Sequence, residues 1–175
     1  MPDFRRESSE VAARFHREAE WYVASTLREL HVFRVHANSE RVVELFLRLS
    51  TNLDDLVELV IVHERDGLSW RGTTRFLPAV REALGRLRWP ISSYGGAEIS
   101  LMTEDDQITL TPYLELVIYS RNARWSERLD GEELPRRERA PSPVFDPRAV
   151  PWAPAPALSK ALAAAVERLN LEPDQ

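Results

Sequence analysis

The spacing of apolar residues along the chain predicts several amphipathic helices. From Val11 to Leu30, apolar side chains recur at steps of three and four residues, with Ser8 or Ser9 placed to cap the first turn. This spacing predicts an N-terminal helix. By the same criterion, further helices are predicted over 40–50, 76–87 and 157–170.

Alternation of apolar and polar residues predicts the strands. Residues 31–37 alternate, and Asp66-Gly67 favours a hairpin turn between strands at 56–64 and 68–74. Residues 97–120 predict two or three more strands, turning at Glu104 to Asp106 and interrupted at Pro112, which cannot donate a ladder hydrogen bond. We expect a loop at 88–96, and an edge strand or a loop at 122–134.

This order of elements predicts an α+β protein with helices beside a largely antiparallel sheet of about five to six strands. The helices should lie on one face of that sheet. We expect one domain over 1–134, a proline-rich strap or linker over 135–157, and a C-terminal helix within 158–175 that docks on the domain.

The two faces of the predicted sheet differ in composition. One is uniformly apolar and should lie under the helices: Phe33, Val35, Leu59, Ile61, Leu114, Leu116 and Ile118. The other mixes charged with apolar side chains: Arg34, His36, Glu58, Glu98, Glu115, Arg121, Val60, Val62, Met102, Val117 and Tyr119. A patch of this kind usually marks a covering element or an interface.

Prolines are concentrated late in the chain, where seven of the twelve lie between Pro135 and Pro156. An extended, proline-stiffened segment loses little entropy when it is laid on a surface. We therefore favour a strap over residues 140–157, with Phe145 and Trp152 among its buried contacts. A solvated linker, or a ligand for an aromatic-lined groove with the spacing of Pro151 to Pro154, remains open. With this strap, the candidate partner-binding residues are Arg34, Met102, Tyr119, Phe145 and Trp152.

The composition of the chain limits the classes of function that we expect for it. The chain has 175 residues, no run of about 18 apolar residues and no apolar signal segment, so we expect a cytoplasmic protein and no membrane partner. No cysteine is present, which excludes disulfides and thiol chemistry. The net charge of -5 argues against nucleic acid as a partner.

His36 and His63 are the most suggestive candidates for chemistry, because each lies near a strand end with carboxylates close in sequence. Strand parity, however, places them on opposite faces of the sheet. We therefore expect no shared metal site. The acidic run Glu104 to Asp106 is interpreted as turn chemistry.

The loop containing Ser92, Ser93 and Tyr94 next to two glycines is a candidate ligand contact, together with His36. It matches neither the phosphate-binding loop nor the dinucleotide fingerprint, and its hydroxyls have no base nearby in sequence. No catalytic residue and no cofactor is predicted.

These observations favour a non-catalytic protein-interaction module, such as an adaptor, chaperone, regulator or immunity-type inhibitor, whose partner is another protein or a second copy of itself. The alternative is a small-ligand domain or hydrolytic enzyme with a pocket between sheet and helices. In that case His36 or His63 would act with a nearby carboxylate.

Overall fold

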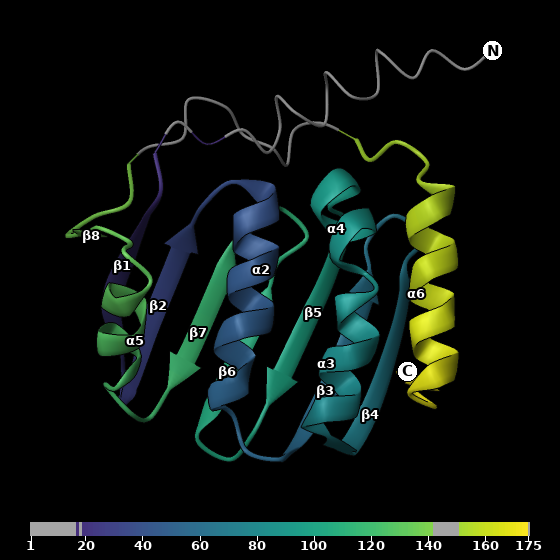
Figure 1. The fold of residues 1–175 in the computed structure, drawn as a ribbon, viewed down its shortest axis with the longest axis horizontal. Coiled ribbons are helices and arrows are strands. Elements are labelled where there is room, and N and C mark those ends of the chain that lie inside the picture. Colours follow the sequence, from purple (N-terminus) through teal and green to yellow (C-terminus); the bar gives the residue numbers. More distant parts are fainter. Residues whose placement is uncertain (1–16, 18, 142–150, 175) are drawn as a thin grey trace.

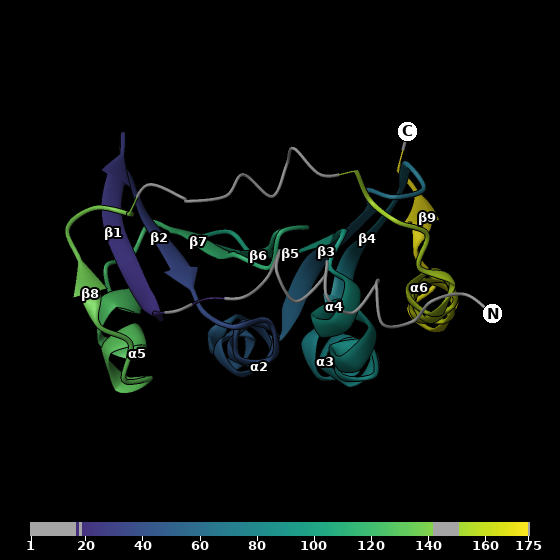
Figure 2. The ribbon, with the colours of Figure 1, turned by 90° about the horizontal axis from the view of Figure 1, so that it is seen from above.

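The computed structural model describes residue 17, residues 19–141 and residues 151–174. They form an α+β structure in which one open sheet is covered by helices on one face (Figures 1 and 2). The class, the largely antiparallel sheet and the one-sided helix layer are therefore as predicted.

The sheet has nine strands in the described residues, in the order β8-β1-β2-β7-β6-β5-β3-β4-β9. In chain order they are β1 (Trp21–Leu27), β2 (Leu30–His36), β3 (Leu56–His63), β4 (Leu68–Phe76), β5 (Ala97–Met102), β6 (Asp106–Leu110), β7 (Leu116–Ser120), β8 (Arg136–Arg137) and β9 (Glu172–Pro173). Neighbouring strands pair antiparallel except β8, which is parallel to β1.

The helices in these residues are α2 (Ser39–Leu49), α3 (Leu77–Gly85), α4 (Arg88–Tyr94), α5 (Trp125–Gly131) and α6 (Pro156–Arg168), with a short 3-10 turn at Ser50–Asn52. Figure 2 shows all five on the same side of the sheet. α2 carries its apolar residues at helical spacing, so that Val42, Phe46 and Leu49 are buried against the strands. The predicted helices at 40–50, 76–87 and 157–170 correspond to α2, α3 and α6.

The predicted hairpin and meander are also present. β3 pairs with β4, and β5, β6 and β7 follow one another as antiparallel neighbours. Gly67 has φ 64°, the positive value that the Asp-Gly pair indicates, although the connection spans the four residues 64–67 and not the three that the predicted strand bounds leave. Pro112 lies between β6 and β7, where no ladder hydrogen bond is required of it.

The prediction of a helix continuing to Leu30 was wrong. Residues 21–27 form β1, which pairs with β2 through a two-residue turn in which Arg28 has φ 57°. The apolar spacing there fits either structure, and pairing with β2 satisfies the backbone groups while burying Trp21 and Tyr22. The earlier part of the predicted helix, up to residue 16, lies outside the described residues.

Two short helices stand where loops or a strand were predicted. Residues 88–94 form α4, which tolerates Pro90 because the first turn of a helix needs no hydrogen bond from that nitrogen. Residues 125–131 form α5, whose Trp125 and Leu129 are one turn apart and fully buried.

The strand count of five to six was too low, because β1 and the two-residue edge strands β8 and β9 were missed. Arg136 and Arg137, which fall in the predicted strap or linker over 135–157, pair with Tyr22 and Val23 of β1. Glu172 pairs with Arg71 at the opposite edge. Both additions sit on sheet edges, where they shorten the exposed backbone of β1 and β4.

α5 is held to the sheet by a buried carboxylate. Asp106 Oδ1 accepts hydrogen bonds from Ser120 Oγ at 2.5 Å and Trp125 Nε1 at 2.8 Å, and Oδ2 accepts one from Arg124 at 2.7 Å. Asp106 is 4% exposed, so these bonds replace the water that the carboxylate has lost. The acidic turn residue of the sequence thus has a structural role.

Candidate functional site

The face of the sheet turned away from the helices, called here the open face, is covered by no helix or strand in the described ranges (Figure 2). Its middle can be followed across every strand, since the paired residues share a face. From β8 to β9 this row consists of Arg137, Val23, Arg34, Val117, Thr109, Ser100, Val60, Arg71 and Glu172.

The division of residues between the faces agrees with the prediction. Leu59 and Ile61 on β3 point under the helices and are fully buried, whereas Val60 and Val62 on the same strand are half-buried on the open face. Alternate side chains of a strand point in opposite directions, so one strand supplies both surfaces.

Three of the five candidate partner-binding residues come together on the open face. Gln107 of β6 is paired with both Met102 and Tyr119, and Arg34 lies across from Val117 in the adjacent row. Phe145 lies outside the described residues. Trp152 is elsewhere, at the end of the sheet near the β3–β4 turn.

Charges on the open face are arranged in cross-strand pairs. Arg34 lies 3.6 Å from Glu115, and Arg71 lies 3.2 Å from Glu58. Arg71 also lies 3.7 Å from Asp174, next to β9. These groups are substantially exposed, so each pair contributes at most about 1 kcal/mol. Their main effect is to determine where the open face carries positive charge and where it carries negative charge.

His36 stacks on Trp21 at the β1–β2 end of the open face. The ring centroids are 4.7 Å apart with an interplanar angle of 15°, and the Arg137 guanidinium lies 5.9 Å from the Trp21 ring. Burial, together with the nearby charges of Arg17 and Arg137, lowers the pKa of His36 to about 4. The imidazole is therefore neutral at pH 7 and serves as a flat packing surface.

Trp152 is anchored between an arginine and a tyrosine. Its ring stacks on Tyr113 with centroids 5.3 Å apart, and the Arg65 guanidinium lies 4.8 Å from its centroid. Arg65 also donates hydrogen bonds to the carbonyls of Ala153 and Tyr94. A side chain at Gly96 would meet Arg65 at 2.7 Å, so this glycine provides the room for the anchor.

His63 lies on the helix side, 1% exposed, with Nδ1 2.9 Å from Asp66 Oδ2. Ser159 Oγ donates to the same carboxylate oxygen at 3.1 Å, while His63 Nε2 is buried with no hydrogen-bond partner in the described ranges. Burial lowers the pKa of His63, against the opposing charge of Asp66. The serine contacts the carboxylate and not the imidazole, so this is no activated nucleophile; it ties α6 to β3.

The predicted ligand residues do not form one site. Ser92, Ser93 and Tyr94 belong to α4 on the helix side, and Ser92 donates a hydrogen bond to the Trp89 carbonyl. His36 is on the open face. His36 and His63 likewise lie on opposite faces, as strand parity predicts.

Comparison of the chain with family models, curated proteins and solved structures found no match. The assignment of a function therefore depends on the geometry alone. Among the described residues, no three His, Asp or Glu side chains are grouped to hold a metal ion. None of the helices in the same ranges is long and apolar enough to cross a membrane.

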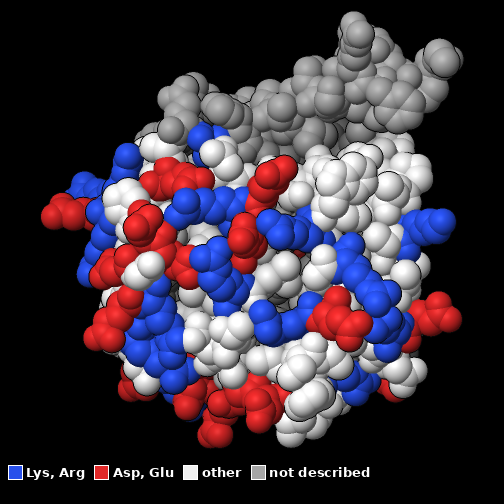
Figure 3. Space-filling view, viewed as in Figure 1, with Lys and Arg blue, Asp and Glu red and all other residues white. Residues whose placement is uncertain are grey.

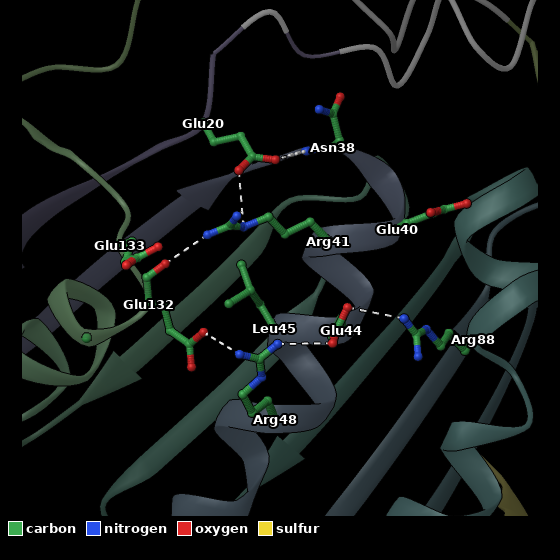
Figure 4. Close-up of a pocket in the computed structure, with 11 residues that line it drawn as sticks. Glu20, Asn38, Glu40, Arg41, Glu44, Leu45, Arg48, Arg88, Glu132 and Glu133 are labelled. Carbon is green, nitrogen blue, oxygen red and sulfur yellow. Dashed lines mark hydrogen bonds and ion pairs between the residues drawn. The ribbon is translucent and has the colours of Figure 1, made fainter.

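A pocket of about 650 Å³ opens on the helix side, where acidic and basic side chains intermingle (Figure 3). An ion-pair network lines it (Figure 4). Arg41 lies 3.1 Å from Glu20, Arg48 lies 2.9 Å from Glu132 and 3.0 Å from Glu44, and Arg88 lies 3.1 Å from Glu44.

The network links β1, α2, α4 and the end of α5, and it was not predicted from the sequence. Its members come from segments far apart in the chain, and no local motif joins them. Each of the three arginines is already engaged by a carboxylate, which leaves the pocket poorly suited to an anion. The arrangement acts as a surface clamp between helices.

Proposed function

We propose that this chain is a non-catalytic protein-binding module and that the open face is its binding surface. The observation that carries the proposal is the composition of that face. Half-buried apolar side chains such as Val60, Met102 and Tyr119 lie among charged ones, with no described element over them. Aromatic residues, Met and Arg are enriched at protein interfaces relative to the rest of the protein surface.

The location of the charges supports the same proposal. Arg34, Glu58 and Arg71 lie around the middle of the face and not in a cleft, so they can define the orientation of a partner and exclude wrong ones. The neutral His36 stacked on Trp21 adds a flat aromatic surface at one end.

The alternative, a small-ligand domain or enzyme using His36 or His63, has less support. The charged pocket is lined by neither histidine. His63 does meet a carboxylate within hydrogen-bonding distance, but the imidazole is 1% exposed. A substrate would have no access to it without local opening.

Site-specific photo-crosslinking tests the proposal. Tyr119 on the open face is replaced by a photoreactive benzoyl-phenylalanine, and the variant is irradiated in cells of the source organism. The matched control carries the same residue at Trp89, a 63% exposed aromatic on α4. Protein adducts from position 119 and few from position 89 support the open face, whereas equal yields at both positions, or none at 119, contradict it.

A further inference from the structure

Part of the open face is buried although no described helix or strand lies over it. Val117, Thr109 and Ser100 occupy the middle row on β7, β6 and β5, and all three are buried. Val60 in the same row and Tyr119 in the row beside it are only half-buried. A buried region on one part of a sheet face usually indicates a covering element or an interface at that place.

The described chain reaches the open face from both sides. The segment after β8 and the segment before α6 both lie on the open-face side of the sheet, at the end that is uppermost in Figure 1 (Figures 1 and 2). This end is called here the upper end. The segment before α6 is fixed there by Trp152, which lies between Tyr113 of the β6–β7 connection and Arg65 of the β3–β4 turn. Residues 142–150, which join the two segments, lie outside the described residues.

The length of this connection restricts the route that it can take. The ten steps from residue 141 to residue 151 span at most about 31–34 Å when the chain is extended. The strands that flank Trp152, β6 to β3, are four to six strand spacings from β8, or about 19–29 Å. A detour to the helix side and back would add on the order of 20 Å, because a helix is about 10 Å across. The direct route over the open face is therefore the one that the chain can span.

The order of charges in the connection matches the order of charges along the upper end. Arg137 on β8 and Arg34 on β2 lie at the side where the connection begins. Glu98 on β5, to which the described residues supply no ion pair, lies toward the side where it ends. Asp146 precedes Arg148 in the chain, so the acid passes the positive side and the arginine reaches the negative side. Opposite charges in matching order favour contact between the two surfaces.

We propose that residues 142–150 pack across the upper end of the open face of the same chain, with Asp146 next to Arg34 and Arg148 next to Glu98. Phe145 then lies against the apolar side chains of the middle row. The prolines of the segment favour an extended chain, which loses little entropy when it is laid on a surface.

This packing goes beyond the proposed function. It covers the upper end and leaves the row of Met102 and Tyr119 to a protein partner, because both ends of the connection lie at the upper end. The segment would therefore define one boundary of the surface that a partner can contact, and it would join the β8 edge of the sheet to the anchor at Trp152.

Thiol crosslinking tests the route, because the chain has no cysteine of its own. Val144→Cys is combined with Val23→Cys on the open face or, as the matched control, with Glu40→Cys on the helix side in the first turn of α2. A short bis-maleimide is added to each full-length double variant at low protein concentration, and the linked peptides are identified by mass spectrometry. We expect the open-face pair to crosslink within one chain at least about tenfold faster than the control pair.

The same reaction in urea provides the reference for the unfolded chain, in which the two pairs close loops of similar length and should react at similar rates. Equal rates for the two folded pairs, or a faster control pair, would overturn the proposal. A crosslink that joins two chains would overturn it as well, because the segment would then lie on a second copy.

Trypsin cleavage after Arg148 tests the charge contacts independently. Arg34→Glu should speed this cleavage about fivefold, because it places like charges next to Asp146 and frees the segment. Adding Asp146→Arg to that variant should restore slow cleavage, and the new arginine precedes Pro147, so it adds no cleavage site. Arg86→Glu, an exposed reversal on the helix side, is the control.

Cleavage after the exposed Arg139 gives an internal reference rate. Wild-type cleavage after Arg148 as fast as after Arg139, or a rate that ignores Arg34→Glu, would contradict the packing. Neither result would affect the proposed function, which depends on the photo-crosslinks from position 119. Conversely, confirmed packing with no protein adduct at position 119 would remove the protein partner and leave this proposal standing.

Discussion

Leu59 and Val60 are neighbours on β3 and experience opposite environments. Leu59 is fully buried under the helix layer, whereas Val60 is half-buried on the open face beside Arg71 and Ser100. The strands, their hydrogen bonds and their registers are common to both faces. The difference between the faces therefore lies in what covers them: the helices pack on one face, and no described helix or strand packs on the other.

The largest contrast is expected between two acids, one on each face. Asp106→Ala should lower the free energy of unfolding by about 3–5 kcal/mol, because Ser120 and Trp125 lose a buried acceptor and Arg124 loses its counter-ion. Glu98→Ala on the open face should change it by less than about 0.5 kcal/mol. Burial and the nearby Glu64 raise the pKa of Glu98, so its charged form is disfavoured where it stands.

Urea unfolding of both variants followed by circular dichroism gives these values. If Asp106→Ala and Glu98→Ala lower the free energy of unfolding by the same amount, the expected difference between the two faces is wrong. A large loss for Glu98→Ala would mean that the open face also supports the fold, and it would count against its role as a binding surface.

A second contrast uses the adjacent residues of β3. Leu59→Ala should cost about 2–5 kcal/mol, since it removes a fully buried side chain and leaves a cavity under the helices. Val60→Ala should lower the free energy of unfolding by less than about 1 kcal/mol, because water already reaches that side chain. Urea unfolding of both variants separates the two effects, and similar losses would show that both faces are core.

The contrast between faces could be read from the sequence because β3 alternates strictly, so parity alone assigns Leu59 and Val60. Elsewhere the local signal was ambiguous. The spacing of Tyr22, Val23 and Leu27 fits a helix as well as a strand, and pairing with β2 decides between them. The two-residue strands β8 and β9 are too short to carry a pattern and exist because a neighbouring edge accepts them.

In the candidate site, too, some features could be predicted from the sequence and others could not. Arg34, Met102 and Tyr119 lie on regular strands, and their common face was predicted from parity. The pocket that joins Glu20, Arg48 and Glu132 could not be predicted, because its members meet only after β1, α2 and α5 have packed. Likewise, the partners of Trp152 come from two turns that no sequence pattern relates to it.

A third contrast uses the two histidines that the sheet separates. The folded chain holds the pKa of His36 at about 4 and lowers that of His63, whereas both stay near 6.5 in the unfolded chain. The unfolded state therefore takes up protons first as the pH falls below about 6.5, and stability decreases from there down to the folded pKa. Above that range neither histidine contributes a pH dependence.

For the half-buried His36 this loss should reach about 1 kcal/mol by pH 5, after allowance for its partial exposure. His36→Phe, which keeps a ring on Trp21, should remove that part of the loss. His63→Gln should remove the rest and lower stability at every pH, because it disturbs the contact with Asp66. Urea unfolding at pH 7.5 and pH 5 checks both, and an unchanged pH dependence in His36→Phe would contradict the assignment.

The smallest contrast compares two tyrosines. Tyr22, on the helix side, donates a hydrogen bond to Asp130 at 2.5 Å, and burial followed by that carboxylate raises its pKa to about 12. Tyr22→Phe should lower the free energy of unfolding by about 1 kcal/mol at pH 7, and Tyr119→Phe on the open face by less than about 0.5 kcal/mol.

The raised pKa of Tyr22 also makes the folded protein less stable as the pH rises from about 10 toward 12, because the unfolded state releases the proton first. Ultraviolet titration of phenolate absorbance should therefore show a late phase that Tyr22→Phe abolishes and Tyr119→Phe retains. Loss of that phase in Tyr119→Phe would mean that the buried phenol lies on the open face, and it would contradict the contrast.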